Sequence, residues 1–137
     1  VPKLKEMASI WLNNFWPTLT LDNEIDYTTL SRDPEMVSSY SKDPLRLTKV
    51  SAPLYLGMVA EMEEVKSKVK NIKGPIYFQV AGQDQVVSAQ ETLDFYKAID
   101  GDKKLSLYNE SYHEIYNDIN RQETIDDLVS YLGQLEA

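Results

Sequence analysis

Residues 60–137 alternate between helical and extended patterns, and this order restricts the fold more than any other feature of the chain. The apolar run 75–81 predicts a buried strand, and the period-two segment 103–109 predicts a second strand near a sheet edge. Apolar residues spaced three or four apart predict a helix before, between and after these strands. The first helix runs to about Ile72, and the last covers 125–135. The middle helix begins after Ser88, which forms a capping box with Glu91, and ends at Asp100. Helices that alternate with strands are typical of an α/β domain with a parallel sheet.

Two strands are too few for such a sheet. A parallel sheet is covered by helices on both faces, and two strands offer almost no surface to cover. With 137 residues the chain has the size of one ordinary domain, yet most of the sheet is expected to lie elsewhere. Either the chain is part of a longer polypeptide, or it pairs with another chain.

The first sixty residues have a less regular pattern and are rich in aromatic residues, Asp, Ser and Thr. The spacing of their apolar residues predicts a helix over 4–16, which Pro17 ends. A loop is expected over 18–32, followed by a short helix after Asp33. Ser51 is expected to cap the helix that runs to about Ile72.

The composition excludes several classes of function. Lys and Arg number 14 against 22 Asp and Glu, and the formal net charge of -8 disfavours nucleic-acid binding. The chain has no Cys and one His, so we expect no disulfide, no metal site and no cofactor. No apolar run approaches the roughly 20 residues that span a bilayer. Because the chain begins with Val1, the lack of a targeting signal leaves the compartment unknown, with a slight preference for the cytoplasm.

Two polar residues follow the predicted strands at equivalent positions. Asp84 lies in the turn after 75–81, and His113 lies in the loop after 103–109. Loops after the carboxyl ends of parallel strands carry functional residues, so the two side chains can meet there. A carboxylate that orients an imidazole prepares it as the general base for a nucleophile. Taken singly, an Asp after Gly is more often a turn residue and a loop His more often a surface residue, so the pattern alone leaves both interpretations open.

Three segments resemble a known superfamily. Residues 81–87 (AGQDQVV) and 112–121 (YHEIYNDINR) are similar to the C-terminal end of the α/β hydrolases, in particular the monoacylglycerol lipase and lysophospholipase branch, also described as serine aminopeptidase-like hydrolases. Residues 30–45 (LSRDPEMVSSYSKDPL) resemble the cap-region signature of those lipases. The implied fold class is α/β, with the last two parallel strands and flanking helices of an α/β-hydrolase fold preceded by a mainly helical cap. The implied domains are a cap over 1–60 and the C-terminal part of the catalytic domain over 61–137.

The resemblance also implies roles for single residues. Asp84 matches the acid and His113 the base of a catalytic triad. The nucleophile of these enzymes is the Ser of a Gly-x-Ser-x-Gly turn, and the five glycines of this chain form no such motif. The Ser and the oxyanion hole are therefore expected in an N-terminal half of the same hydrolase, as a partner without which this chain is inactive. Glu114 is expected to face loop backbone or solvent, whereas Asn117 and Arg121 match the family pattern as loop-fixing residues.

An apolar helix surface in the expected cap bears on the substrate. The resemblance implies a lid over the mouth of the active site, with some residues in contact with an acyl chain or a lipid surface. The flanks of this helix are only weakly basic, so membrane contact is expected to be peripheral at most. The surface consists of Met7, Ile10, Trp11, Phe15 and Trp16.

The function predicted from these features is that of a serine hydrolase. It cleaves a carboxylic ester, such as a monoacylglycerol or lysophospholipid, through a Ser-Asp-His triad. Two alternatives stay open. An Asp in place of the nucleophilic Ser is typical of an epoxide hydrolase or dehalogenase, and loss of the nucleophile leaves a non-catalytic, hydrolase-like binding protein.

Overall fold

The computed structural model describes residues 3–135, with side chains from Met7 onward. Its internal contacts divide the chain into two compact units. The first unit combines Val1–Glu24 with Leu45–Lys68, and the second combines Ile25–Pro44 with Val69–Ala137. Each unit is therefore built from two separate stretches of the chain.

The first unit holds two helices that pack on each other and a short pair of strands. The helix predicted over 4–16 is confirmed, and it ends just before Pro17. Part of the predicted loop 18–32 instead forms a strand, which pairs antiparallel with a second strand in the register Leu21↔Val50. In chain order the elements are α1 (Lys3–Phe15), β1 (Thr20–Asp22), β2 (Lys49–Ser51) and α3 (Ala52–Ser67).

The residues at its two ends explain where α3 begins and ends. The Ser51 side chain accepts a hydrogen bond from the backbone N–H of Leu54, which satisfies one free donor of the first turn. The helix ends at Ser67, before the predicted end at Ile72. Lys68 leaves the helical conformation there, and the chain continues as a single 3-10 turn, η2 (Val69–Asn71).

The second unit contains a parallel pair of strands, as the helix and strand patterns predict. The strands run in register from Ile76↔Lys103 to Ala81↔Tyr108. The predicted Ser88 cap is confirmed, because its hydroxyl accepts a hydrogen bond from the Glu91 backbone at 3.2 Å. Besides η2, the elements are η1 (Tyr27–Thr29), α2 (Pro34–Lys42), β3 (Ile76–Ala81), α4 (Ala89–Ala98), β4 (Lys103–Tyr108) and α5 (Arg121–Leu135).

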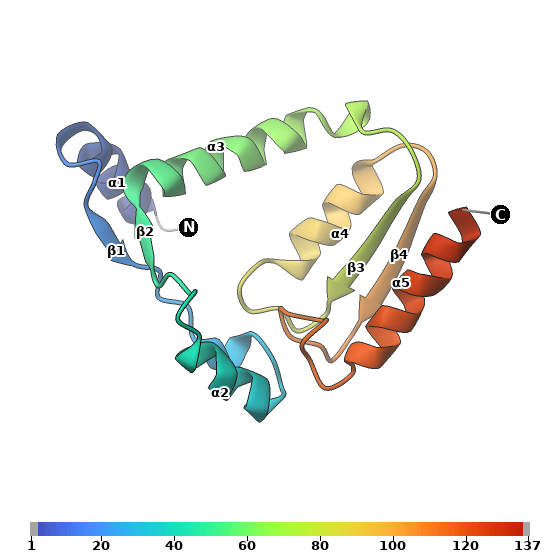
Figure 1. Ribbon diagram of the computed structural model, residues 1–137. Helices are drawn as coiled ribbons and strands as arrows, with labels where there is room; N and C mark the ends of the chain where they lie inside the picture. Colours follow the sequence, from blue (N-terminus) through green and yellow to red (C-terminus); the bar gives the residue numbers. More distant parts are fainter. Residues whose placement is uncertain (1–2, 136–137) are drawn as a thin grey trace. The chain divides into compact units, whose positions relative to one another are not determined.

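Alternate residues of β3 face different helices. Phe78 contacts the rings of Phe95 and Tyr96 in α4, whereas Tyr77 contacts the ring of Tyr131 in α5. Successive side chains of a strand point to opposite faces, so α4 and α5 cover the two faces of the strand pair (Figure 1). The buried core at the carboxyl end of the strands consists of Ala81, Tyr108 and Ile115.

The two units do not follow the boundary predicted at residue 60. Residues 25–44 group with the parallel strands because Leu30 and Ser31 are buried there and hydrogen-bond to the loop around His113. Residues 61–67 belong to α3, and the first unit extends to Lys68. The assignment of 1–60 to a cap and 61–137 to the C-terminal part of a catalytic domain stays a prediction.

Candidate active site

Asp84 and His113 meet where the two parallel strands end. Asp84 lies in the turn that follows β3, and His113 lies in the loop that follows β4. The Asp84 Oδ2 atom is 2.8 Å from His113 Nδ1, which is a hydrogen bond. The Asp84 side chain is 7% exposed and the His113 side chain 33%. The carboxylate is thus enclosed, while one part of the imidazole stays accessible.

Backbone hydrogen bonds fix the direction of the Asp84 carboxylate. Its Oδ1 atom accepts from the N–H groups of Val86 and Val87 at 2.8 and 2.9 Å. The other oxygen, Oδ2, is the one that meets His113. Because two N–H donors hold Oδ1, the Asp84 side chain is already oriented. Its Oδ2 atom therefore meets the imidazole with little further loss of side-chain entropy.

The two loops approach each other at Gly82. A Cβ atom at this position would lie 2.6 Å from the Asn109 Cα atom and 2.7 Å from its carbonyl oxygen, so only glycine fits. The Gly82 N–H donates to the Tyr108 carbonyl at 2.8 Å, and the Gln83 N–H donates to that of Ser111 at 3.0 Å. This backbone contact brings the acid-bearing turn and the His-bearing loop together.

The geometry assigns the tautomer of His113. A neutral imidazole whose Nδ1 donates to a carboxylate carries its acceptor lone pair on Nε2. That arrangement is the one a general base uses to take a proton from a nucleophile. A cavity of about 240 Å³ adjoins the pair, and its lining includes Gln79, Asp84, Thr92, His113 and Ile115.

A polar cluster surrounds the side of the loop that follows His113. The Glu114 carboxylate accepts from the Tyr40 hydroxyl at 2.5 Å and from the Asn117 amide at 2.6 Å. The expectation that Glu114 faces loop backbone or solvent is therefore wrong, because α2 supplies a phenol that reaches it. Arg121 Nη1 donates to Asp33 at 3.1 Å, which links the start of α5 to the residue that caps α2.

Asp118 is the most enclosed charged group of the site. Its side chain is 0% exposed and accepts hydrogen bonds from three backbone N–H groups, those of Arg32, Tyr112 and Ile119, each at 2.9 Å. The Arg32 Nε atom donates to both carboxylate oxygens, at 3.2 and 3.0 Å. Burial opposes the charge, but the N–H donors of Tyr112, Arg32 and Ile119 outweigh it and lower the pKa of Asp118 below its ordinary value.

The family model described as "Serine aminopeptidase, S33" matches residues 1–120. The chain belongs to this family of α/β hydrolases. The resemblance of residues 30–45, 81–87 and 112–121, and the α/β-hydrolase fold class that it implied, are thereby confirmed.

Individual relatives of this hydrolase chain are lipases. It is 24% identical over 133 residues to a monoacylglycerol lipase of Mycolicibacterium smegmatis, covering 96% of this chain and 47% of the relative. It is 25% identical over 125 residues to the phospholipase YtpA of Bacillus subtilis, covering 90% and 48%. The crystal structure of Paleococcus ferrophilus monoacylglycerol lipase matches with a TM-score of 0.90 at 26% identity, over 96% of this chain and 52% of that one. The chain thus spans about half the length of these relatives.

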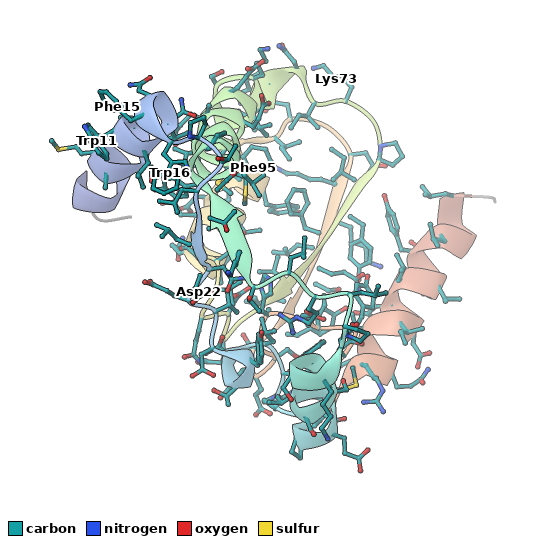
Figure 2. All side chains as sticks on the ribbon, turned by 60° about the vertical axis from the view of Figure 1, so that its left-hand side comes forward. Trp11, Phe15, Trp16, Asp22, Lys73 and Phe95 are labelled. Atoms are coloured by element: carbon teal, nitrogen blue, oxygen red, sulfur yellow. The ribbon has the colours of Figure 1, made fainter. Side chains whose placement is uncertain are left out.

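The residues predicted to form a lid lie in or next to α1 of the hydrolase chain, in the first unit. Figure 2 shows Trp11 and Phe15 on α1. Their ring centroids are 5.0 Å apart. All five residues are largely exposed: Met7 68%, Ile10 48%, Trp11 60%, Phe15 71% and Trp16 59%. The structure thus leaves these five apolar side chains exposed in or next to α1, while their role as a lid stays a proposal.

Sequence reasoning missed the contacts that Arg32, Tyr40 and Asp118 make around the loop of His113. Arg32 and Asp118 do stand in the segments that carry the resemblance, but nothing in their spacing pairs them. Within residues 3–135, no group of three or more acidic or His residues is arranged to hold a metal ion. In that same range no helix combines the length and the apolar character needed to cross a membrane.

Proposed function

We propose that this chain supplies the acid and the base of a serine hydrolase that cleaves acyl esters, such as a monoacylglycerol or a lysophospholipid. The observation that carries the proposal is the 2.8 Å hydrogen bond between Asp84 Oδ2 and His113 Nδ1 at the ends of parallel strands. The Ser nucleophile and the oxyanion hole come from an N-terminal half of the same hydrolase. Membership of a family of serine hydrolases supports this arrangement.

His113 moves the proton in both halves of the reaction. Its Nε2 atom accepts the proton of the Ser hydroxyl as the Ser oxygen attacks the ester carbonyl. It then delivers that proton to the leaving alcohol, and water regenerates the Ser by the same steps. Asp84 keeps Nε2 free and stabilises the imidazolium that forms at each proton transfer. The exposed fraction of His113, against the enclosed Asp84, matches these roles.

The apolar surface of α1 is the proposed contact for the acyl chain. Trp11 and Phe15 offer two large rings side by side, and burying such rings against a hydrocarbon chain is favourable. The curated relatives named above as a monoacylglycerol lipase and a phospholipase support a substrate with an acyl chain and a polar head group. Contact with a lipid surface through α1 is peripheral in this proposal.

The test uses the full-length protein and a fluorophosphonate that labels activated serines. We expect covalent labelling, hydrolysis of monoacylglycerol, and loss of turnover by about 10⁴-fold in His113→Gln and in Asp84→Asn. The matched control is Asp94→Asn, an exposed acidic residue of α4 that pairs with Lys97, and it should retain full activity.

The same experiment separates the alternatives. A protein with no labelled Ser but with an Asp that the substrate alkylates would be an epoxide hydrolase or a dehalogenase. A protein without label or turnover would be a hydrolase-like binding protein. Turnover that survives in both His113→Gln and Asp84→Asn would overturn the assignment of these residues.

A further inference from the structure

We propose that the buried ion pair of Arg32 and Asp118 is the positioning element for His113. It ties the loop that carries the imidazole to residues 30–33, the start of the segment that carries α2. The proposal rests on the proposed function, since it gives His113 the role of the base. Arg32 and Asp118 are positioning residues and touch no reacting atom.

Two backbone hydrogen bonds bracket His113 in the chain. On one side, the N–H of Tyr112 donates to Asp118 Oδ2 at 2.9 Å. On the other side, the N–H of Glu114 donates to the Leu30 carbonyl at 2.8 Å. The loop has no regular secondary structure between β4 and α5, so no ladder of hydrogen bonds holds the imidazole in place. These two anchors therefore set the position of its Cα atom.

Both anchors lead to the same short segment. Glu114 bonds directly to Leu30, and Tyr112 bonds to Asp118, which in turn holds the Arg32 backbone and guanidinium. The neighbouring Ser31 is 2% exposed, and its hydroxyl donates to the Asn117 carbonyl at 2.8 Å. Residues 30–32 thus act as one side of a clamp on the loop, and Asp118 is its centre.

The donor pattern of Asp118 makes the clamp sensitive to small chemical changes. Oδ1 accepts from the N–H groups of Arg32 and Ile119, while Oδ2 accepts from Tyr112, and Arg32 Nε reaches both oxygens. An Asn side chain has one acceptor oxygen and one NH₂ group, which is a donor. In either orientation, the NH₂ group would face backbone N–H donors and could not accept their hydrogen bonds. Asp118→Asn is therefore expected to displace Tyr112 and, with it, the imidazole of His113.

A second ion pair offers a matched control. Arg121 and Asp33 also join the segment at 30–33 to the chain that follows His113, at 3.1 Å, but the Arg121 side chain is half exposed. In the described part of the chain, the Tyr112 N–H donates to Asp118 and not to Asp33. If every link between the two segments contributed equally to the position of His113, Arg121→Gln would harm the reaction as much as changes at Asp118.

The experiment compares Asp118→Asn, Arg32→Gln, Arg32→Lys and Arg121→Gln in the full-length protein. Active enzyme is counted from the end point of fluorophosphonate titration, so that unfolded protein does not enter kcat. We expect kcat per titrated site to fall by about 10²-fold in Asp118→Asn and Arg32→Gln, with little change in KM, because small displacements of a catalytic group have this effect. Arg32→Lys should fall less, and Arg121→Gln should match the wild type.

A spectroscopic reading accompanies the kinetics. The proton shared by His113 and Asp84 gives a low-field imidazole N–H resonance, which we expect to weaken or move in Asp118→Asn and to persist in Arg121→Gln. If Asp118→Asn does not fold, Arg32→Lys carries the test, since it keeps the charge and the Arg32 backbone bond.

Distinct results overturn the two proposals. Wild-type turnover that is retained per titrated site in both Asp118→Asn and Arg32→Gln, or lost equally in Arg121→Gln, refutes the positioning role alone. A wild-type protein with neither label nor turnover refutes the proposed function, and the positioning role falls with it.

Discussion

Gly82 and Asn109 pack so closely that a Cβ atom on Gly82 would come within 2.6 Å of the Asn109 Cα atom. This contact joins the turn that carries Asp84 to the loop that follows β4. No side chain with flexible atoms lies there to move aside, because all three of the nearest atoms belong to the Asn109 backbone. This contact between two main chains thus fixes the closest approach of the Asp84 turn to the loop that carries His113.

Replacing Gly82 by Ala should force these loops apart. We expect Gly82→Ala to lower the free energy of unfolding by about 1–3 kcal/mol, the usual cost of overpacking, and to lower kcat. Thermal unfolding and ester hydrolysis of the full-length protein measure both effects. The control is Gly57→Ala, because Gly57 lies inside α3 with nothing within 4 Å of its added Cβ. Equal behaviour of the two variants would refute the close contact.

Removal of the Tyr40 hydroxyl should loosen the loop next to His113. This hydroxyl donates to Glu114 and accepts from Asn117, so Tyr40→Phe leaves a partly buried carboxylate short of a donor. We expect a loss of about 1–2 kcal/mol in the free energy of unfolding and a modest fall in kcat. Tyr96→Phe is the control, because the Tyr96 hydroxyl has only a weak contact of 3.4 Å to the Lys103 carbonyl. A larger effect from the control would contradict the prediction.

The low pKa of Asp118 links stability to pH. A carboxyl whose pKa is lower in the folded state stabilises the fold above its unfolded pKa, and this contribution is lost as the pH falls through the folded pKa. The free energy of unfolding of the wild type should therefore decrease from about pH 5 downward. In Asp118→Asn that part of the slope should be missing, so the two unfolding curves converge in acid. Curves that stay parallel would exclude a charged Asp118 in the folded state.

The proposed acyl contact of α1 should depend on chain length. Trp11→Ser removes a ring that is 60% exposed, so little stability should be lost. For long acyl esters we expect kcat/KM to fall by roughly fivefold, equivalent to about 1 kcal/mol of lost apolar contact, and for short esters hardly at all. Leu45→Ser changes another exposed residue, 88% accessible, and should show no such dependence. A uniform loss for all esters would argue against the contact.

Local patterns made much of the second unit predictable. The apolar run of β3, the Ser88 cap and the alternation in β4 are signals within a few residues, and the parallel pairing follows from their order. The placement of Asp84 and His113 follows in turn, because the carboxyl ends of parallel strands lie at one edge. These features depend on hydrophobic periodicity, on helix capping and on the order of helices and strands, which can be read from the sequence.

The other features of the fold and of the site depend on contacts between residues far apart in the sequence, which produce no periodic pattern. β1 and β2 have three residues each, too few for a pattern, and their pairing is visible only in the fold. Arg32 and Asp118 are 86 residues apart, and each alone looks like an ordinary charged residue of a loop. The hydrogen bond between Glu114 and Tyr40 leaves no local signal either, because the two residues are 74 positions apart in the sequence.

The discontinuous make-up of the two units has a consequence for synthesis on the ribosome. Arg32 leaves the ribosome 86 residues before Asp118, which at about 5–20 residues per second is a delay of roughly 4–17 s. The first unit ends at Lys68 and has all its strands and helices by then. Residues 25–44, which interrupt it, must wait for their buried partners to be translated. Residues 30–33, which we propose to position His113, thus lack their buried partners until that later part of the chain has been translated.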